Sequence, residues 1–120
     1  MTSPSTIAAL LPLKPVELEI LLALATEERH GYGLVQAIAE RTDGLVQLEP
    51  GNLYRVIKRL LADGIVAESD RRPVTEGSER RRYYRLTALG ARVVRADLHR
   101  MRTLLASAPA RALIRRFGTT

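Results

Sequence analysis

The sequence predicts a mainly helical protein that carries one small β-hairpin. Apolar residues recur at spacings of three and four in four separate segments, which is typical of amphipathic helices. Between the third and fourth segments, two short runs rich in β-branched and aromatic residues flank a stretch of turn-forming residues, which indicates a hairpin. A chain of 120 residues with 46% hydrophobic and 27% charged residues fits a folded domain with one modest core. We therefore expect a single domain over residues 1–120.

The first two predicted helices have clear start or stop signals. In the segment LKPVELEILLALA, Pro15 occupies the first-turn position that proline favours. Apolar residues then recur at helical spacing; they are Val16, Ile20 and Leu24. The second predicted helix lies in HGYGLVQAIAERTDG, with Leu34 and Ile38 facing inward. We expect Gly44 to be its C-cap, because glycine adopts the left-handed conformation that ends many helices.

The third predicted helix is followed by the hairpin. It lies in EPGNLYRVIKRLLADG, where Pro50 opens the helix and Gly64 closes it. The run IVAES then predicts one strand, and RRYYRLT predicts the returning strand. The residues between the two runs are typical of turns.

The last predicted helix is long and completes the order of elements. Thr87 can cap a helix from about residue 88 to residue 108, which Pro109 should break or kink. Three helices, a β-hairpin and a long helix are the order of a winged helix-turn-helix with an appended helix. We expect the winged helix-turn-helix over residues 13–87, and a C-terminal dimerisation helix and tail over residues 88–117.

The third predicted helix has one apolar face and one polar, cationic face. At about 100° per residue, its apolar residues fall within one arc; they are Leu53, Val56, Ile57, Leu60 and Leu61. The opposite side carries Asn52, Arg55, Lys58 and Arg59, with Tyr54 at the border. Asparagine pairs in bidentate fashion with adenine and arginine with guanine, and the start of a recognition helix contacts base edges. This face is therefore a candidate DNA-reading surface.

Charge is divided unevenly along the chain. Residues 1–50 hold three basic and seven acidic side chains, whereas residues 51–120 hold sixteen basic and six acidic ones. This asymmetry indicates a polyanionic partner for the second part of the molecule. Seventeen of the nineteen cations are arginine, which forms bidentate hydrogen bonds to phosphate and guanine. An arginine-rich genome would produce the same bias, so charge alone does not identify the partner.

The segment ERRRYYRLT, residues 79–87, crowds arginines beside two tyrosines. In a strand, alternate side chains share a face, so we expect Tyr84 and Leu86 to pack on the helices. Tyr83 could stack on a sugar or shield the hairpin, and we favour the second, structural role. The remaining arginines lie near the tip of the wing, where they would contact phosphates or enter the minor groove; they are Arg80, Arg81 and Arg82.

The sequence carries no pattern that indicates catalysis or metal binding. The two histidines, His30 and His99, are far apart in sequence, and the chain has no cysteine for a disulfide or a thiolate metal site. No serine–histidine–carboxylate cluster or phosphate-binding glycine loop can be argued. We expect His30 to cap and pack at the start of the second helix, and Tyr32 to contact DNA backbone. We interpret the chain as a non-enzyme without cofactor or metal.

The last predicted helix carries an apolar seam. Its members recur at spacings of three and four; they are Ala91, Val94, Leu98, Met101, Leu105 and Ala108. A helix of about twenty residues is ~30 Å long, which is longer than so small a domain can cover. This length favours pairing with a second copy over covering the chain's own core. The segment ARALIRRFG after Pro109 could form a short tail helix that adds to that contact, and TIAALLPL at the other end could do likewise.

The sequence contains no membrane or export signal. No basic region precedes the first short apolar run, and prolines interrupt that run. No apolar stretch approaches the roughly 18 residues that a membrane helix needs. We therefore expect a soluble, cytoplasmic protein without a membrane partner.

Three stretches together resemble the PadR family of transcriptional regulators. They are HGYGL, LEPGNLYRVIKRLLADGIV and RRYYRLTALG, and the resemblance as a whole covers roughly residues 13–90. The resemblance implies a winged helix-turn-helix that binds operator DNA as a dimer through its C-terminal helix, usually as a repressor. The family's PG-x-LY segment opens the recognition helix and matches Pro50, Gly51, Leu53 and Tyr54 here.

Two features set this chain apart within the family it resembles. Asn52 stands where the family more often has threonine or serine, so the operator sequence of another member does not transfer. The short C-terminal part resembles compact members without a large separate dimerisation domain. Apolar pockets at the dimer interface of such folds can admit small hydrophobic ligands, so a small hydrophobic effector is a candidate partner.

We predict a sequence-specific DNA-binding transcriptional regulator, a repressor that binds a palindromic site in double-stranded DNA as a homodimer. Two other functions stay open at this point. A winged helix can bind structured RNA, or its basic face can meet an acidic protein partner.

Overall fold

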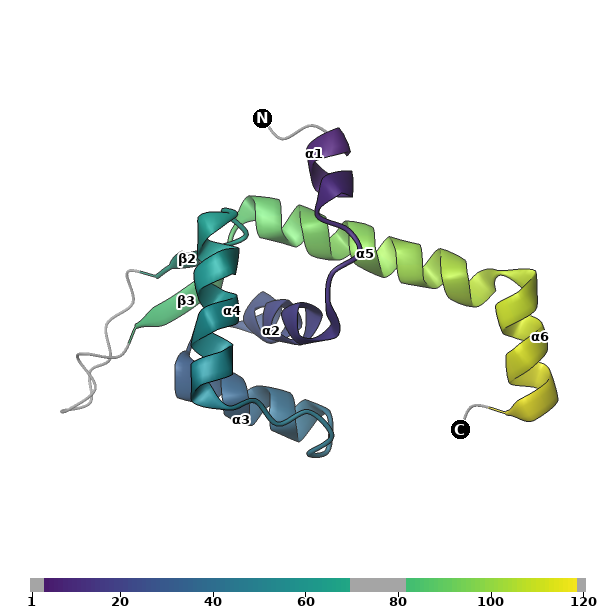
Figure 1. Ribbon diagram of the computed structural model, residues 1–120, viewed down its shortest axis with the longest axis horizontal. Coiled ribbons are helices and arrows are strands. Elements are labelled where there is room, and N and C mark those ends of the chain that lie inside the picture. The colour runs from purple at the N-terminus through teal and green to yellow at the C-terminus, as the bar shows by residue number, and fades with distance from the viewer. Residues whose placement is uncertain (1–3, 70–81, 119–120) are drawn as a thin grey trace.

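The computed structural model describes residues 4–69 and 82–118 and contains the predicted helices and hairpin in the predicted order, together with a short N-terminal helix and a short additional strand. The elements are α1 (Pro4–Ala9), α2 (Pro15–Thr26), β1 (Arg29–His30), α3 (Gly31–Arg41), α4 (Pro50–Ala62), β2 (Val66–Glu68), β3 (Tyr83–Leu86), α5 (Ala88–Ala106) and α6 (Ala108–Phe117). Helices α2, α3 and α4 form a bundle beside the sheet, while α5 extends away from it and α6 turns off its far end (Figure 1). This arrangement confirms the mainly helical winged-helix prediction.

The core lies where α2, α3, α4, the sheet and the first half of α5 meet. Its fully buried apolar side chains are Ile20, Leu21, Leu34, Ile38, Leu53, Ile57, Leu60, Ile65, Val66 and Val93. The predicted apolar face of α4 supplies three of them, Leu53, Ile57 and Leu60, which are spread along the helix. Because burial of these side chains is the main force that fixes α4, its opposite face is held rigidly toward solvent. None of the described helices is long and apolar enough to cross a membrane.

The sheet has three antiparallel strands in the order β1-β3-β2. Strands β2 and β3 form the predicted hairpin, and Tyr84 on β3 is buried as expected. Strand β1 was not predicted: Arg29 pairs with Tyr84 and His30 with Tyr83. Two residues are too few to show the alternation that reveals a strand, so β1 depends on pairing with β3.

The C-terminus of α4 was predicted correctly, whereas that of α3 was not. Gly64 has a φ of 74°, and its amide donates to the Leu61 carbonyl at 3.1 Å just after α4. In α3 the C-cap is Thr42 and not Gly44. The chain turns out of the helix at Asp43, which has a φ of 52°, and the Asp43 and Gly44 amides donate back to the Glu40 carbonyl at 3.3 Å and the Ala39 carbonyl at 2.7 Å.

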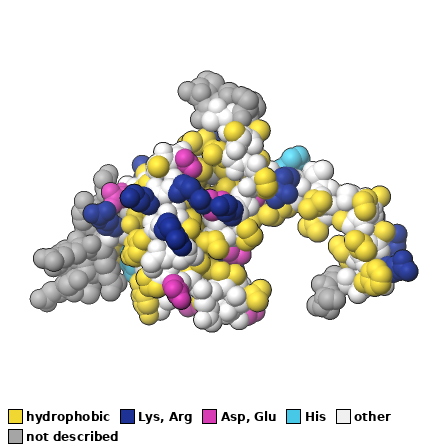
Figure 2. All heavy atoms as spheres, in the orientation of Figure 1, with side chains coloured by type: hydrophobic (Ala, Val, Ile, Leu, Met, Phe, Trp, Pro, Cys, Tyr) yellow, Lys and Arg dark blue, Asp and Glu magenta, His cyan; other side chains and the backbone are white. Residues whose placement is uncertain are grey.

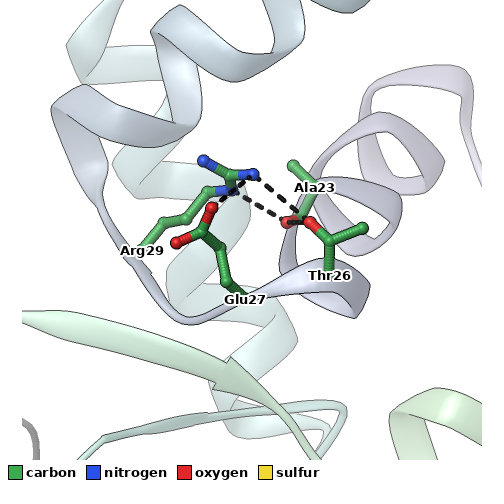
Figure 3. Close-up of polar contacts among 4 residues, drawn as sticks. All are labelled: Ala23, Thr26, Glu27 and Arg29. Atoms are coloured by element: carbon green, nitrogen blue, oxygen red, sulfur yellow. Dashed lines mark hydrogen bonds and ion pairs between the residues drawn. The ribbon is translucent and has the colours of Figure 1, made fainter.

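Arg29 closes the end of α2 (Figure 3). Its Nε donates to the Ala23 carbonyl at 2.9 Å, and its Nη2 donates to Thr26 Oγ1 at 3.3 Å. The same Nη2 lies 3.4 Å from a carboxylate oxygen of Glu27. The guanidinium therefore binds a carbonyl in the last turn of α2 and holds the short connection that leads into α3.

The last predicted helix ends close to the predicted break, and the segment after it forms a separate tail helix, as expected. Thr87 caps α5 as predicted, since its hydroxyl accepts from the Gly90 amide at 2.9 Å. The helix ends at Ala106, however, before the predicted end at residue 108. A continued helix would bring the Pro109 ring against a carbonyl four residues earlier. The chain instead leaves the helix at Ser107, which caps α6 and leaves Pro109 in its first turn.

Candidate nucleic-acid interface

The outer face of α4 is the most cationic helix face of the winged-helix region that the structure describes. Arg55, Lys58 and Arg59 are exposed there, and Asn52 is half-buried near the start of the helix. Figure 2 shows Lys and Arg side chains gathered over α4. The structure thus brings the predicted polar residues of this helix together on one exposed surface.

Asn52 and Arg55 form a pair at the start of this surface. The Arg55 Nη2 donates to Asn52 Oδ1 at 2.6 Å. The two residues are three apart on a helix, so their side chains are neighbours. The pairing leaves the amide hydrogens of Asn52 and the other guanidinium hydrogens of Arg55 available to an external acceptor. It presents both groups together where a recognition helix meets base edges.

Arg59 differs from its neighbour Lys58 in having an acidic partner. Its Nη2 lies 2.5 Å from Glu17 Oε2 at the start of α2, and the Glu17 side chain is only 13% exposed. The other oxygen of Glu17 accepts from the Lys14 amide at 2.8 Å. Lys58 has no ion pair among the described residues. Sequence reasoning missed the Arg59–Glu17 pair because 42 residues separate its members.

Tyr54 is half-exposed and lies against the start of α3. A Cβ atom at Gly31 would come within 2.5 Å of the Tyr54 hydroxyl oxygen, so a larger residue there would force the ring to shift. The glycine of HGYGL and the tyrosine of the PG-x-LY segment therefore fit one another. Burial raises the pKa of Tyr84 behind this contact, and Tyr54 and Glu68 raise it further, so that phenol remains neutral at physiological pH.

The beginning of α3 carries a capped, packed histidine and an exposed tyrosine. His30 Nδ1 accepts from the Gly33 amide at 3.1 Å, and its ring packs edge-on against Tyr83 at 5.2 Å between centroids. These contacts confirm the predicted capping and packing role of His30 and the structural role of Tyr83. Tyr32 is 64% exposed in the first turn of α3 and can meet an external partner.

The wing is described only at its base. Arg82 is exposed, and its Nε lies 3.5 Å from a Glu68 carboxylate oxygen on the facing strand. Arg80 and Arg81 lie outside the described residues. Arg85, which the sequence analysis did not assign to the DNA-binding surface, is also exposed on β3. Its position on the face opposite buried Tyr84 was the signal that could have identified it.

The predicted seam of α5 separates into a buried and an exposed part. Val94 is 5% exposed and belongs to the chain's own core, and Ala91 is half-buried. Farther along, Leu98 is 41% exposed and Leu105 is 59% exposed, with Met101 half-buried between them and Ala108 exposed at the start of α6. The apolar surface continues on α6; its members there include Leu113, Ile114 and Phe117.

A winged helix that presents a cationic helix such as α4 is typical of helix-turn-helix regulators. The chain belongs to the transcriptional regulator PadR-like family, whose sequence model matches residues 20–96. This membership confirms the resemblance found in the sequence and places the chain among transcriptional regulators and not among enzymes.

Solved structures share the fold. A transcriptional regulator from Clostridium thermocellum is 24% identical, with a TM-score of 0.65 over 87% of this chain and 93% of that one. Bacillus subtilis PadR in complex with operator DNA is 21% identical, with a TM-score of 0.61 over 72% of this chain and 48% of that one.

A curated relative, the uncharacterized protein X of Lysinibacillus sphaericus, is 35% identical over 71 residues. The match covers 59% of this chain and 63% of that protein, so it spans less than two thirds of the relative's length.

Proposed function

We propose that this protein is a sequence-specific DNA-binding repressor that binds an inverted repeat as a homodimer. The observation that carries the proposal is the outer face of α4. Its polar pair, Asn52 and Arg55, lies beside Lys58, a cation without an ion pair among the described residues, on a helix whose opposite face is buried in the core. A rigid helix with bidentate donors at its start is the arrangement that reads base edges in a major groove.

Different residues take different parts in this proposal. Asn52 and Arg55 discriminate bases, while Lys58 and Tyr32 contact phosphates. The wing arginines add phosphate contacts beside the groove; they are Arg80, Arg81 and Arg82. Tyr54 fixes α4 against α3 and borders the DNA surface. Arg59 orients α4 on α2 through Glu17 and contributes less charge than Lys58 does.

The exposed apolar part of α5 supports the homodimer. Leu98, Met101 and Leu105, continued by Ala108, form a stripe that the chain's own core does not cover. Pairing two such stripes would remove apolar surface from water. Because closed two-fold symmetry presents the same surface twice, two α4 helices would then meet two half-sites of opposite orientation.

The experiment that tests this function is selection of bound duplexes from a random DNA pool. We expect an enriched inverted repeat with the wild-type protein. Asn52→Ala and Arg55→Ala should relax base preference at defined positions of each half-site, by roughly 1–3 kcal/mol per lost bidentate contact. Lys58→Ala is the matched control, which should weaken binding without changing the preferred sequence.

Three outcomes would contradict the proposal. If structured RNA competes as well as the selected duplex, the basic face binds RNA. If no sequence is enriched and only an acidic protein partner binds, the winged helix is a protein-interaction module. If both α4 variants keep the wild-type base preference, Asn52 and Arg55 do not read bases.

A further inference from the structure

A row of basic side chains runs along one face of α5. Arg92, Arg95, His99 and Arg102 recur at spacings of three and four, so they lie on the same side of the helix. Together with Ile7 of α1 and Leu98 they line a groove of about 610 Å³. All four basic side chains are exposed.

The described part of the chain provides no carboxylate to neutralise this row. Asp97 is the only acidic residue of α5, and it is fully buried, with Oδ1 accepting from Arg100 Nε at 2.9 Å. Arg92, Arg95 and Arg102 form no ion pair with any described residue. Like charges at these spacings destabilise a helix. Arg92 and Arg95, three residues apart, therefore carry a small cost in folding free energy and have no acidic partner in the described chain.

The net charge of the whole chain lies in the same region. Residues 1–87 hold twelve basic and twelve acidic side chains and are neutral overall, whereas residues 88–120 hold seven basic and one acidic. The winged-helix region thus carries its cations among an equal number of acids. The excess positive charge belongs to the segment that contains α5 and α6, which indicates an anionic partner of their own.

We propose that the groove between α1 and α5 binds a small polyanion that bears at least two phosphate or carboxylate groups. Guanidinium groups bind both kinds of group in bidentate fashion. The row from Arg92 to Arg102 spans ~15 Å of helix, so a single phosphate cannot reach all of its members.

The position of the groove separates it from the proposed DNA surface. Helices α1 and α3 lie on opposite sides of α5, and the start of α3 belongs to the DNA surface (Figure 1). A polyanion in the groove is therefore a second ligand and not the operator itself. Leu98 also belongs to the exposed apolar stripe, which places the ligand beside the proposed contact between subunits.

The test is isothermal titration calorimetry with inorganic tripolyphosphate as the probe, at about 0.15 M salt so that unspecific attraction is screened. Three full-length proteins are compared: wild type, Arg95→Gln/Arg102→Gln and Arg111→Gln/Arg115→Gln. The last is the matched control, because it removes the same charge from exposed positions on α6. We expect saturable binding to wild type and control, and binding weakened by roughly tenfold or more in the groove variant.

Exposed side chains contribute little to stability, so all three proteins should fold, which circular dichroism would verify. The groove variant should also keep its affinity for the selected DNA duplex, so this test is independent of the proposed function. Equal weakening in both variants would show a response to net charge only and overturn the proposal. Absence of saturable binding to wild type would overturn it as well. Loss of DNA affinity with unchanged tripolyphosphate binding would assign the row to DNA.

Discussion

Lys58 and Arg59 are adjacent cations on α4, yet their surroundings differ. The ammonium of Lys58 extends into solvent without an ion pair in the described chain, whereas the Arg59 guanidinium binds the mostly buried Glu17 of α2. A cation that already neutralises an acid gains less from a phosphate, because it must give up or share that partner. The surface of α4 therefore combines groups that are available to DNA with a group that fixes the helix.

Lys58→Ala and Arg59→Ala should consequently have opposite effects on protein stability and on DNA binding. Loss of Lys58 should leave the free energy of unfolding nearly unchanged and lower the slope of log affinity against log salt by about 0.9 per contact. Loss of Arg59 should lower the free energy of unfolding by roughly 1 kcal/mol, since Glu17 loses its partner in a mostly buried position. Urea denaturation and salt titration measure the two effects. Equal profiles would contradict the distinction.

Asp97 is a second residue whose contribution to stability depends on its surroundings. Its side chain is fully buried, and Oδ2 has no hydrogen-bond partner within the part of the chain that the structure describes. Buried charges with incomplete hydrogen bonding are costly, and removal of the partner of such a charge is more costly still. The half-exposed Arg100 is the only group that compensates the carboxylate among the described residues.

Two substitutions at this pair test the argument. Arg100→Ala should lower the free energy of unfolding by roughly 1–3 kcal/mol, because it leaves a buried carboxylate unpaired. Asp97→Leu should raise it by about 1 kcal/mol, since a buried apolar side chain of similar size replaces the charge while Arg100 remains hydrated. Urea denaturation of both variants gives the comparison. A stabilised Arg100→Ala protein would contradict it.

At the scale of elements, α5 serves two purposes along its length. Its first half supplies Val93 and Val94 to the core, and its second half presents an apolar stripe that the described part of the chain leaves exposed. Figure 2 shows hydrophobic side chains along the far part of α5 and over α6. An apolar surface of this kind on a small protein marks an interaction site. The second half of α5 is therefore where a second copy is expected to bind.

Met101→Glu tests the proposed dimer at the centre of the stripe. A carboxylate placed in an apolar contact costs several kcal/mol unless it is paired, so the variant should be a monomer. Its DNA affinity should fall as well, because two half-sites can no longer be bound together. Analytical ultracentrifugation measures the change. Thr103→Glu, on the exposed polar side of the same helix, is the matched control and should remain dimeric.

At the scale of the whole molecule, the distribution of charge differs from what the net charge suggests. The excess of six positive charges lies beyond residue 87, and the winged-helix region is neutral overall. In the proposed function its cations act through their placement on α4 and the wing and not through their number. The DNA surface and the excess charge therefore belong to different parts of the molecule.

A salt titration of wing variants tests the contribution of the wing to DNA binding. If the wing arginines contact phosphates, replacement of Arg80, Arg81 and Arg82 by alanine should lower the salt slope by roughly two to five per dimer. Binding should weaken almost equally on specific and random duplexes, and folding should barely change. The Arg111→Gln/Arg115→Gln protein is a control for total charge. An unchanged slope in the wing variant would mean that these arginines form only a solvated surface.

The sequence by itself determined those features that depend on residues within a few positions of one another. Pro15 and Pro50 mark helix starts, Gly64 marks a helix end, and Thr87 caps α5, because each acts on backbone groups of its own turn. The two faces of α4 were likewise predictable, since the period of a helix separates Leu53, Ile57 and Leu60 from the polar residues.

Only the tertiary structure decided the features that depend on distant residues meeting in space. Strand β1 exists through its pairing with β3, and Arg59 is bound by Glu17 from another helix. Val94 fitted the predicted seam by spacing, yet α5 packs on the domain so that Val94 is buried in the core and Leu98 is not. Periodicity gives the angle of a side chain around its own helix. The neighbour that it meets there is set by how the helices and the sheet pack together.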